Sequence, residues 1–175
     1  MNYLSDFNRG MTIDEYKPLL GDQQAVHDLH YKKTLIDHTL NLPDNLKILV
    51  LTEPWCGDST AILPVLQKLF EKGNVKIRIL SRDDNLQLMD QFLTYGSQAI
   101  PIILILDKDG NYLDRFGPRP AEAQKIFDAH REAIQRGEIE KFEVIRKIRT
   151  FYSKNRGKAI MSDFVRILNK SVAKK

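Results

Sequence analysis

The single cysteine of this chain, Cys56, is the residue whose chemistry is most directly predicted by its position. It lies in the run Trp55-Cys56-Gly57-Asp58-Ser59, where a strand pattern gives way to a helix pattern. The first turn of a helix has unpaired N–H groups and a partial positive charge, which stabilise a thiolate and lower the pKa of a thiol. We therefore expect an exposed, reactive thiol that exchanges with disulfides or forms thiol adducts.

Two neighbours should act on this thiol in opposite directions. The carboxylate of Asp58 would repel a thiolate and raise the pKa of Cys56, whereas the hydroxyl of Ser59 could donate a hydrogen bond to the thiolate and lower it. Because the two effects oppose each other, the sequence predicts no strong activation. A lone cysteine also excludes a disulfide within the chain and a zinc site built from several cysteines.

Two prolines and a glycine stand at informative distances from Cys56. Pro64 falls eight residues later, inside the predicted helix, where a proline removes a hydrogen bond and bends the helix. Ile100-Pro101 comes directly before the most apolar run of the chain. A proline at the first residue of a strand can be cis and can leave the edge open to the backbone of a partner. Gly117 closes the last predicted strand, sixteen residues after Pro101.

Alternating and continuous apolar runs predict the elements that position these residues. Strands are expected at residues 47–52, 75–80, 102–106 and 111–116, and helices from Cys56 to Gly73, at 85–94 and at 121–136. A helix between the first two strands makes them parallel, and the Asp-Lys-Asp-Gly turn at 107–110 makes the last two antiparallel. The order predicts an α/β core with a mixed sheet.

Both ends of the chain have helical patterns, at 12–42, 138–153 and 158–172. We therefore divide the chain into a helical N-terminal extension (1–45), a core (46–137) and a helical C-terminal extension (138–175). The chain carries a net charge of +4, and residues 141–175 hold eleven of its Lys and Arg residues beside two acids. This basic extension could contact an acidic partner, although a solvated helical face explains the charge as well. Its residues at helical spacing are expected to face a core: Phe142, Ile145, Ile148 and Tyr152.

Composition and the absence of certain patterns bound the remaining possibilities. No apolar run reaches about 18 residues, and the first residues lack the pattern of a secretory signal, so we expect no membrane contact and a cytoplasmic protein. Neither a P-loop nor a dinucleotide-binding glycine motif occurs. The residues predict no cofactor and no metal site.

The motif residues together resemble the thioredoxin superfamily in type, order and spacing, over about residues 46–136. The resemblance implies a three-layer α/β/α core, a cis Pro101 facing the reactive cysteine, and an Ile100 backbone that pairs with a bound peptide. It implies catalytic roles for Cys56 and Ser59. The residues that it places around the substrate are Trp55, Gly57, Asp58, Ile100, Pro101 and Gly117.

The chain departs from the family pattern at three positions. Ser59 stands where the family has its second cysteine, so Cys56 has no internal thiol to resolve a mixed disulfide. Val50 falls near the position of the family's buried carboxylate, and Asp58 replaces a frequent proline. An exchange reaction would therefore need an external reductant thiol.

Three functions remain open on this evidence. In the first, Cys56 attacks a protein disulfide or a low-molecular-weight disulfide, and an external thiol releases the product. In the second, the fold has lost catalysis and serves as a binding or regulatory module. In the third, the Cys56-Gly57-Asp58-Ser59 run handles iron–sulfur clusters, since some monothiol glutaredoxin-like proteins use a C-G-x-S motif. Whether the protein is an enzyme is left open.

Overall fold

A mixed four-stranded sheet forms the centre of the computed structural model, which describes residues 1–37, 40 and 42–173. The strands are β1 (Lys47–Thr52), β2 (Lys76–Ser81), β3 (Ile102–Leu106) and β4 (Tyr112–Phe116), in the order β2-β1-β3-β4. β1 and β2 are parallel, and β1–β3 and β3–β4 are antiparallel. The predicted strands, the mixed sheet and the α/β class are confirmed.

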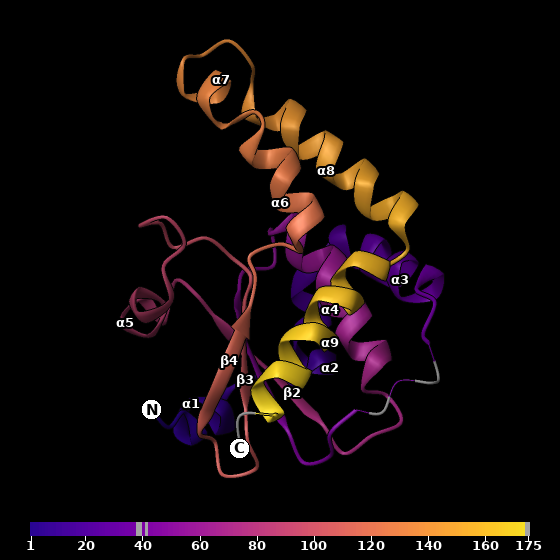
Figure 1. Cartoon of the computed structure of the whole chain (residues 1–175), viewed down its shortest axis with the longest axis vertical. Helices are drawn as coiled ribbons and strands as arrows, with labels where there is room; N and C mark the ends of the chain where they lie inside the picture. The colour runs from indigo at the N-terminus through magenta and orange to yellow at the C-terminus, as the bar shows by residue number, and fades with distance from the viewer. Residues whose placement is uncertain (38–39, 41, 174–175) are drawn as a thin grey trace.

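Helices cover both faces of this sheet (Figure 1). One face carries α4 (Gly57–Leu69), α2 (Ile13–Tyr16), the 3-10 turn η1 (Lys17–Leu20), α3 (Gln23–Lys33) and α9 (Lys158–Val172). The other carries α1 (Leu4–Arg9), α5 (Leu86–Met89) and the 3-10 turn η2 (Asp90–Phe92). Of the N-terminal range 12–42 predicted to be helical, positions 38, 39 and 41 lie outside the described residues.

Alternate residues of the central strands supply two separate apolar cores. Val50 and Ile103 belong to the core under α4, which also contains Phe164 of α9. Leu49 and Leu104 belong to the core on the opposite face. All five of these side chains are fully buried. Because both faces are covered, the central strands β1 and β3 are buried at nearly every position, as the continuous apolar run at 102–106 indicated for β3.

The predicted helix at 85–94 is shorter than expected. α5 and η2 end at Phe92, and the guanidinium of Arg115 then donates hydrogen bonds to the carbonyls of Phe92 (2.6 Å) and Leu93 (3.3 Å). Carbonyls at a helix end need such partners, and here a side chain from β4 replaces the next turn of the helix.

The predicted helix at 121–136 is interrupted, which corrects the sequence expectation. It forms α6 (Ala121–Asp128) and α7 (Arg131–Gln135), with the break at His130. The Nδ1 atom of His130 lies 2.8 Å from the Ile126 carbonyl oxygen, and the backbone N–H of His130 bonds to Phe127 instead. The histidine side chain thus takes the carbonyl that a continuing helix would use.

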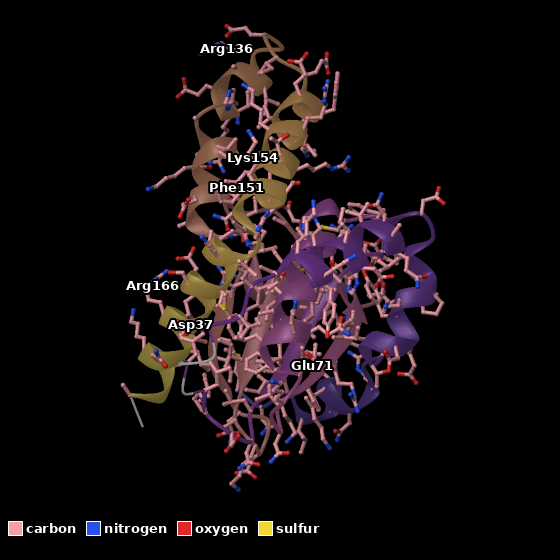
Figure 2. All side chains as sticks on the ribbon, turned by 90° about the vertical axis from the view of Figure 1, so that its right-hand side faces the viewer. Asp37, Glu71, Arg136, Phe151, Lys154 and Arg166 are labelled. Atoms are coloured by element: carbon pink, nitrogen blue, oxygen red, sulfur yellow. The ribbon has the colours of Figure 1, made fainter. Side chains whose placement is uncertain are left out.

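A helical arm extends from the body of the molecule. It consists of α6 and α7 lying against α8 (Lys141–Asn155), and Arg136 marks its far end (Figures 1 and 2). Ile148 and Tyr152 of α8 are buried, as predicted, whereas Phe142 is 56% exposed, so the prediction that it faces a core is wrong. Phe142 lies in the first turn of α8, away from the sheet, where little of the body can cover it.

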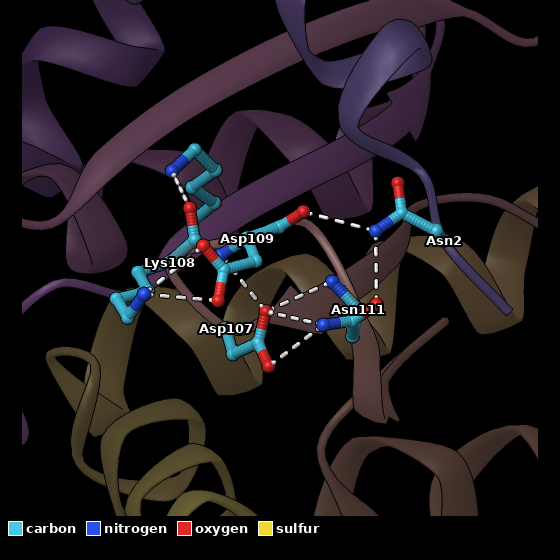
Figure 3. A network of polar contacts seen from close by, with 6 residues as sticks. Asn2, Asp107, Lys108, Asp109 and Asn111 are labelled. Atoms are coloured by element: carbon cyan, nitrogen blue, oxygen red, sulfur yellow. Dashed lines mark hydrogen bonds and ion pairs between the residues drawn. The ribbon is translucent and has the colours of Figure 1, made fainter.

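The start of the chain is tied to the turn between β3 and β4 (Figure 3). The amide of Asn2 donates hydrogen bonds to the Asp109 carbonyl and to the Asn111 side chain, both at 2.9 Å. Asp107 accepts from the backbone N–H groups of Asp109 and Asn111, which closes the predicted turn. Among the described residues, no helix is long and apolar enough to cross a membrane.

Candidate functional site

Cys56 is the N-cap residue of α4, in the short turn that follows β1. Its backbone N–H donates to the carbonyl of Glu53 at 3.0 Å, and its own carbonyl accepts from both the N–H (3.1 Å) and the hydroxyl (3.0 Å) of Thr60. These bonds fix the cysteine at the strand-to-helix junction that the sequence predicted.

The thiol of Cys56 is not exposed, and the expectation of an exposed thiol is wrong. The residue is 6% exposed, and its Sγ atom donates a hydrogen bond of 3.5 Å to the carbonyl oxygen of Ile100. The loop before β3 therefore covers the sulfur on one side. The Ile100–Pro101 peptide bond in this loop is cis.

Gly117 holds the Ile100–Pro101 loop in place by having no side chain. Its φ is +117°, and a Cβ atom there would lie 2.2 Å from the carbonyl oxygen of Pro101. No other residue type fits this contact without displacing the loop. Gly117 therefore supports the Ile100–Pro101 loop through this close backbone contact.

Burial dominates the acidity of the thiol. It raises the pKa of Cys56 above its ordinary value, hydrogen bonding by Ser59 lowers that pKa, and the nearby charge of Asp58 raises it. The opposing effects of Ser59 and Asp58 are those that the sequence predicted. Ser59 is itself buried and its hydroxyl is hydrogen-bonded to that of Thr52. The helix start alone thus does not produce an acidic thiol.

Asp58 is held by two residues that the sequence analysis did not single out as site residues. Its carboxylate accepts a hydrogen bond from Arg119 Nε at 2.9 Å and from the Tyr152 hydroxyl at 2.7 Å. Burial raises the pKa of Asp58, and the charge of Arg119 and the bond from Tyr152 oppose that rise. Burial and the Asp58 charge in turn raise the pKa of Tyr152.

A groove of about 720 Å³ opens over Cys56, between the body of the molecule and the helical arm. Trp55, which is 62% exposed, lies at its edge with the Arg82 guanidinium 5.5 Å from the ring centroid. Tyr95 and Arg131 also line it and stack at 4.1 Å, joining the loop before β3 to α7. The arm therefore forms one side of the groove and contributes to the burial of Cys56 at its base.

The structure brings most, but not all, of the predicted site residues to this groove. Five of the eight line it: Trp55, Cys56, Gly57, Asp58 and Ile100. The other three, Ser59, Pro101 and Gly117, lie outside its lining, and Ser59 is 1% exposed. Val50 is fully buried in the core, so no carboxylate occupies its position.

Sequence reasoning missed the cationic side of the site. Arg119 lies two residues after Gly117, and Arg149 lies three residues before Tyr152, on the helix that was treated only as a basic extension. The guanidinium of Arg149 is 3.4 Å from the point that a Cβ atom of Gly57 would occupy, beside the start of α4. The helical spacing of Ile148 and Tyr152 was the available signal, because it indicated which face of α8 turns toward the core.

No group of three or more His, Cys, Asp or Glu side chains able to hold a metal comes together in the part of the chain that the structure describes. The chemically distinctive groups of the groove are the thiol, the buried carboxylate and the guanidinium groups.

Comparison with known proteins places this arrangement in a family. A family model described as Thioredoxin matches residues 21–133. Thioredoxin from Bacillus subtilis (strain 168) is 35% identical over 81 residues, which cover 44% of this chain and 74% of that protein.

Two solved structures have a similar fold over nearly the whole chain. A crystal structure of an HIV epitope-scaffold has a TM-score of 0.66 and 22% identity, covering 97% of this chain and 99% of its own. A protein of unknown function from Pseudomonas aeruginosa has a TM-score of 0.64 and 20% identity, covering 92% and 96%.

Proposed function

Because this chain belongs to the thioredoxin family, we propose that Cys56 carries out thiol–disulfide exchange as a single reactive thiol. The observation that carries this proposal is the position of its Sγ atom. It lies at the floor of the groove, at the start of α4 and 3.5 Å from the carbonyl oxygen that precedes Pro101. A disulfide entering the groove reaches this sulfur from the open side.

The exchange proceeds in two balanced steps. The Cys56 thiolate, having released its proton to solvent, attacks one sulfur of a substrate disulfide. The substrate S–S bond breaks, a mixed disulfide with Cys56 forms, and the other sulfur leaves as a thiolate. An external thiolate then attacks the substrate sulfur of the mixed disulfide, so that Cys56 leaves as a thiolate and the substrate carries away a new disulfide with the external thiol.

Ser59 explains why the second step requires an external reductant. It occupies the position from which a second cysteine would attack the mixed disulfide, and a hydroxyl cannot do so. Ser59 instead supports the Cys56 thiolate by hydrogen bonding. The partners that follow are a disulfide-bearing substrate and a small reductant thiol, which a reducing compartment such as the cytoplasm supplies.

The direct test is the formation and release of a mixed disulfide. The folded protein is incubated with hydroxyethyl disulfide at pH 8 and its intact mass is measured, before and after addition of a reduced thiol. We expect one adduct, absent in Cys56→Ser, that the thiol removes. Protein that gives no adduct while folded, but labels fully when unfolded in urea, would show that Cys56 is not an exchange residue.

A second function is favoured by one specific observation, the 6% exposure of Cys56, and this burial also raises the pKa of its thiol. A buried, weakly acidic thiol suits a binding or regulatory module that uses the groove and the Ile100 edge without chemistry. Replacing the natural gene in cells with one that encodes Cys56→Ser distinguishes the two functions. The binding function predicts normal growth and partner capture, and the exchange function predicts their loss.

A further inference from the structure

The groove above Cys56 has a strong excess of positive charge. Five cationic side chains line it, Arg82, Arg119, Arg131, Lys141 and Arg149, against a single carboxylate, that of Asp58. The carboxylate is already bound by Arg119 and Tyr152. A surface that gathers this many cations around one reactive atom attracts and orients anions.

Not all of these cations are free to meet a ligand. Arg82 is paired with Asp83 at 2.7 Å, and Arg131 lies 3.7 Å from Asp128. Arg149 and Lys141 of α8 are exposed and form no ion pair with a described residue, although the charge of Arg149 acts on Asp58. They are therefore the two lining cations with capacity for a new partner.

Of these two cations, Arg149 is the one that a contact places beside the start of α4. Its guanidinium approaches the first residue of α4, Gly57, and so lies beside the turn that holds Cys56. An arginine binds a carboxylate or phosphate through two parallel N–H donors, which fixes the orientation of the bound group. A ligand anchored there is held beside the residue that follows Cys56.

We propose that the groove selects a small anionic disulfide, whose carboxylate binds Arg149 while its sulfur meets Cys56, and that Lys141 adds to the positive charge of the groove without contacting the same carboxylate. This inference rests on the proposed exchange function and names its substrate class. The volume of the groove, about 720 Å³, lies in the range of small-molecule sites, about 300–1,000 Å³. The arm walls the groove on one side, which favours a small ligand over a folded protein surface.

A neutral polar group of the walls also fits such a ligand. Thr94 lines the groove, and its hydroxyl has no hydrogen-bond partner among the described residues and is a donor suited to a carboxylate. Exposed Trp55 at the rim offers an apolar surface to the carbon chain of the ligand. The sequence indicated that the basic C-terminal extension could contact an acidic partner. Two of its cations, Lys141 and Arg149 of α8, line the groove and would face the anionic ligand.

The test compares three disulfides of nearly equal size and different charge: dithiodipropionate (anionic), hydroxyethyl disulfide (neutral) and cystamine (cationic). Rates of mixed-disulfide formation are measured by intact mass and divided by the rates for the urea-unfolded chain, which removes intrinsic reactivity. We expect dithiodipropionate to react about tenfold faster than cystamine, and added salt to reduce the difference. Equal normalised rates would overturn the proposal.

Matched arginine variants localise the effect. Arg149→Gln should reduce the anion-to-cation rate ratio about threefold to tenfold, whereas Arg136→Gln at the far end of the arm (Figure 2) should leave it unchanged. Because a ratio is compared, a change in the thiolate fraction of Cys56 cancels. If both variants changed the rate ratio equally, or if neither changed it, the role of Arg149 would be contradicted.

A binding measurement separates this proposal from the exchange function on which it rests. Trp55 is the single tryptophan of the chain and lies at the groove edge, so its fluorescence reports occupancy. In Cys56→Ser, dithiodipropionate should change this fluorescence saturably, and cystamine should not. Saturable binding without any adduct in the natural protein would refute exchange and retain the anion site. Adducts that form at equal normalised rates with all three disulfides, without saturable binding, would support exchange and refute the anion site.

Discussion

The Tyr152 hydroxyl donates a 2.7 Å hydrogen bond to the carboxylate of Asp58, which joins the first turn of α4 to a helix 94 residues later. Asp58 is two residues from Cys56, so the bond couples the helical arm to the reactive turn. Tyr152 is buried and the Asp58 side chain is 13% exposed, and a largely buried carboxylate without its partners is costly. The arm is therefore part of the site.

Removal of this hydrogen bond should destabilise the protein. Tyr152→Phe keeps the ring but deletes the donor, leaving Asp58 with Arg119 as its one hydrogen-bonding side chain among the described residues. We expect a loss of about 1–3 kcal/mol in the free energy of unfolding, measured by urea denaturation at pH 7. Tyr95→Phe, whose side chain is 69% exposed, is the control and should change stability little. Equal stability of both variants would show that the bond contributes nothing.

The charge of Asp58 should suppress the reactivity of Cys56. Burial and this charge both raise the pKa of the thiol, so the thiolate is scarce at neutral pH. The alkylation rate of the natural protein with iodoacetamide should therefore rise about tenfold per pH unit and continue to rise beyond pH 8.5, without a plateau below it. A plateau near pH 7 would contradict the raised pKa.

Asp58→Asn removes the repulsion and should shift that profile toward lower pH. We expect alkylation at pH 8 to be about threefold to tenfold faster, because the loss of one nearby negative charge lowers a thiol pKa by up to about one unit. Asp14→Asn, on the exposed side of α2, serves as the control and should leave the rate unchanged. Circular dichroism establishes that each variant is folded. A slower Asp58→Asn would reverse the assigned sign.

The sequence predicted the sheet closely because its two central strands, β1 and β3, are buried on both faces. Where strand and helix patterns alternate, a short continuous apolar run such as 102–106 indicates a buried strand. The same order of patterns places Cys56 at a junction between a strand and a helix. Pro64 lies within α4 and the turn at 107–110 closes a hairpin, both as local patterns indicated. These features depend on residues close together in the chain.

What the sequence did not reveal depends on contacts between distant segments. The Ile100 loop, 44 residues away, covers Cys56 on one side, and Asp58 accepts one of its two side-chain hydrogen bonds from α8 and the other from Arg119. The break at His130 depends on one side chain taking a backbone carbonyl, which helical periodicity does not register. Periodicity also predicts which face of α8 is apolar, but not that Arg149 beside that face reaches Gly57.

Restoring a second cysteine should create dithiol chemistry. Ser59 follows Cys56 by three residues at the start of α4, within reach of its sulfur, and hydrogen bonding between the two lowers the pKa of Cys56. In Ser59→Cys we expect an internal disulfide under mild oxidation, seen as loss of both free thiols, and a gain of insulin reduction over the natural protein. Ser59→Ala should show neither. If both thiols of Ser59→Cys stayed free under oxidation, the Cys56 sulfur would not be oriented toward position 59.

The contact between Gly117 and Pro101 should be the most sensitive point of the loop beside the thiol. Gly117→Ala places a Cβ 2.2 Å from the Pro101 carbonyl oxygen at a φ of +117°, so the Ile100–Pro101 loop must move. Gly137→Ala is a matched control, because Gly137 also has a positive φ, +71°, but has nothing within 4 Å of its Cβ position.

Both glycine variants incur a conformational penalty for positive φ, about 1–2 kcal/mol in the left-handed region of Gly137 and more at the φ of Gly117, so the difference between them reports the extra backbone strain together with the steric clash. We expect Gly117→Ala to lose at least about 2 kcal/mol more unfolding free energy than Gly137→Ala. Because the displaced loop includes the Ile100 carbonyl that accepts from Cys56, its thiol should also be alkylated faster in folded Gly117→Ala. Equal stability and equal alkylation rates in the two variants would mean that the loop is not held by this contact, and that the burial of Cys56 has another cause.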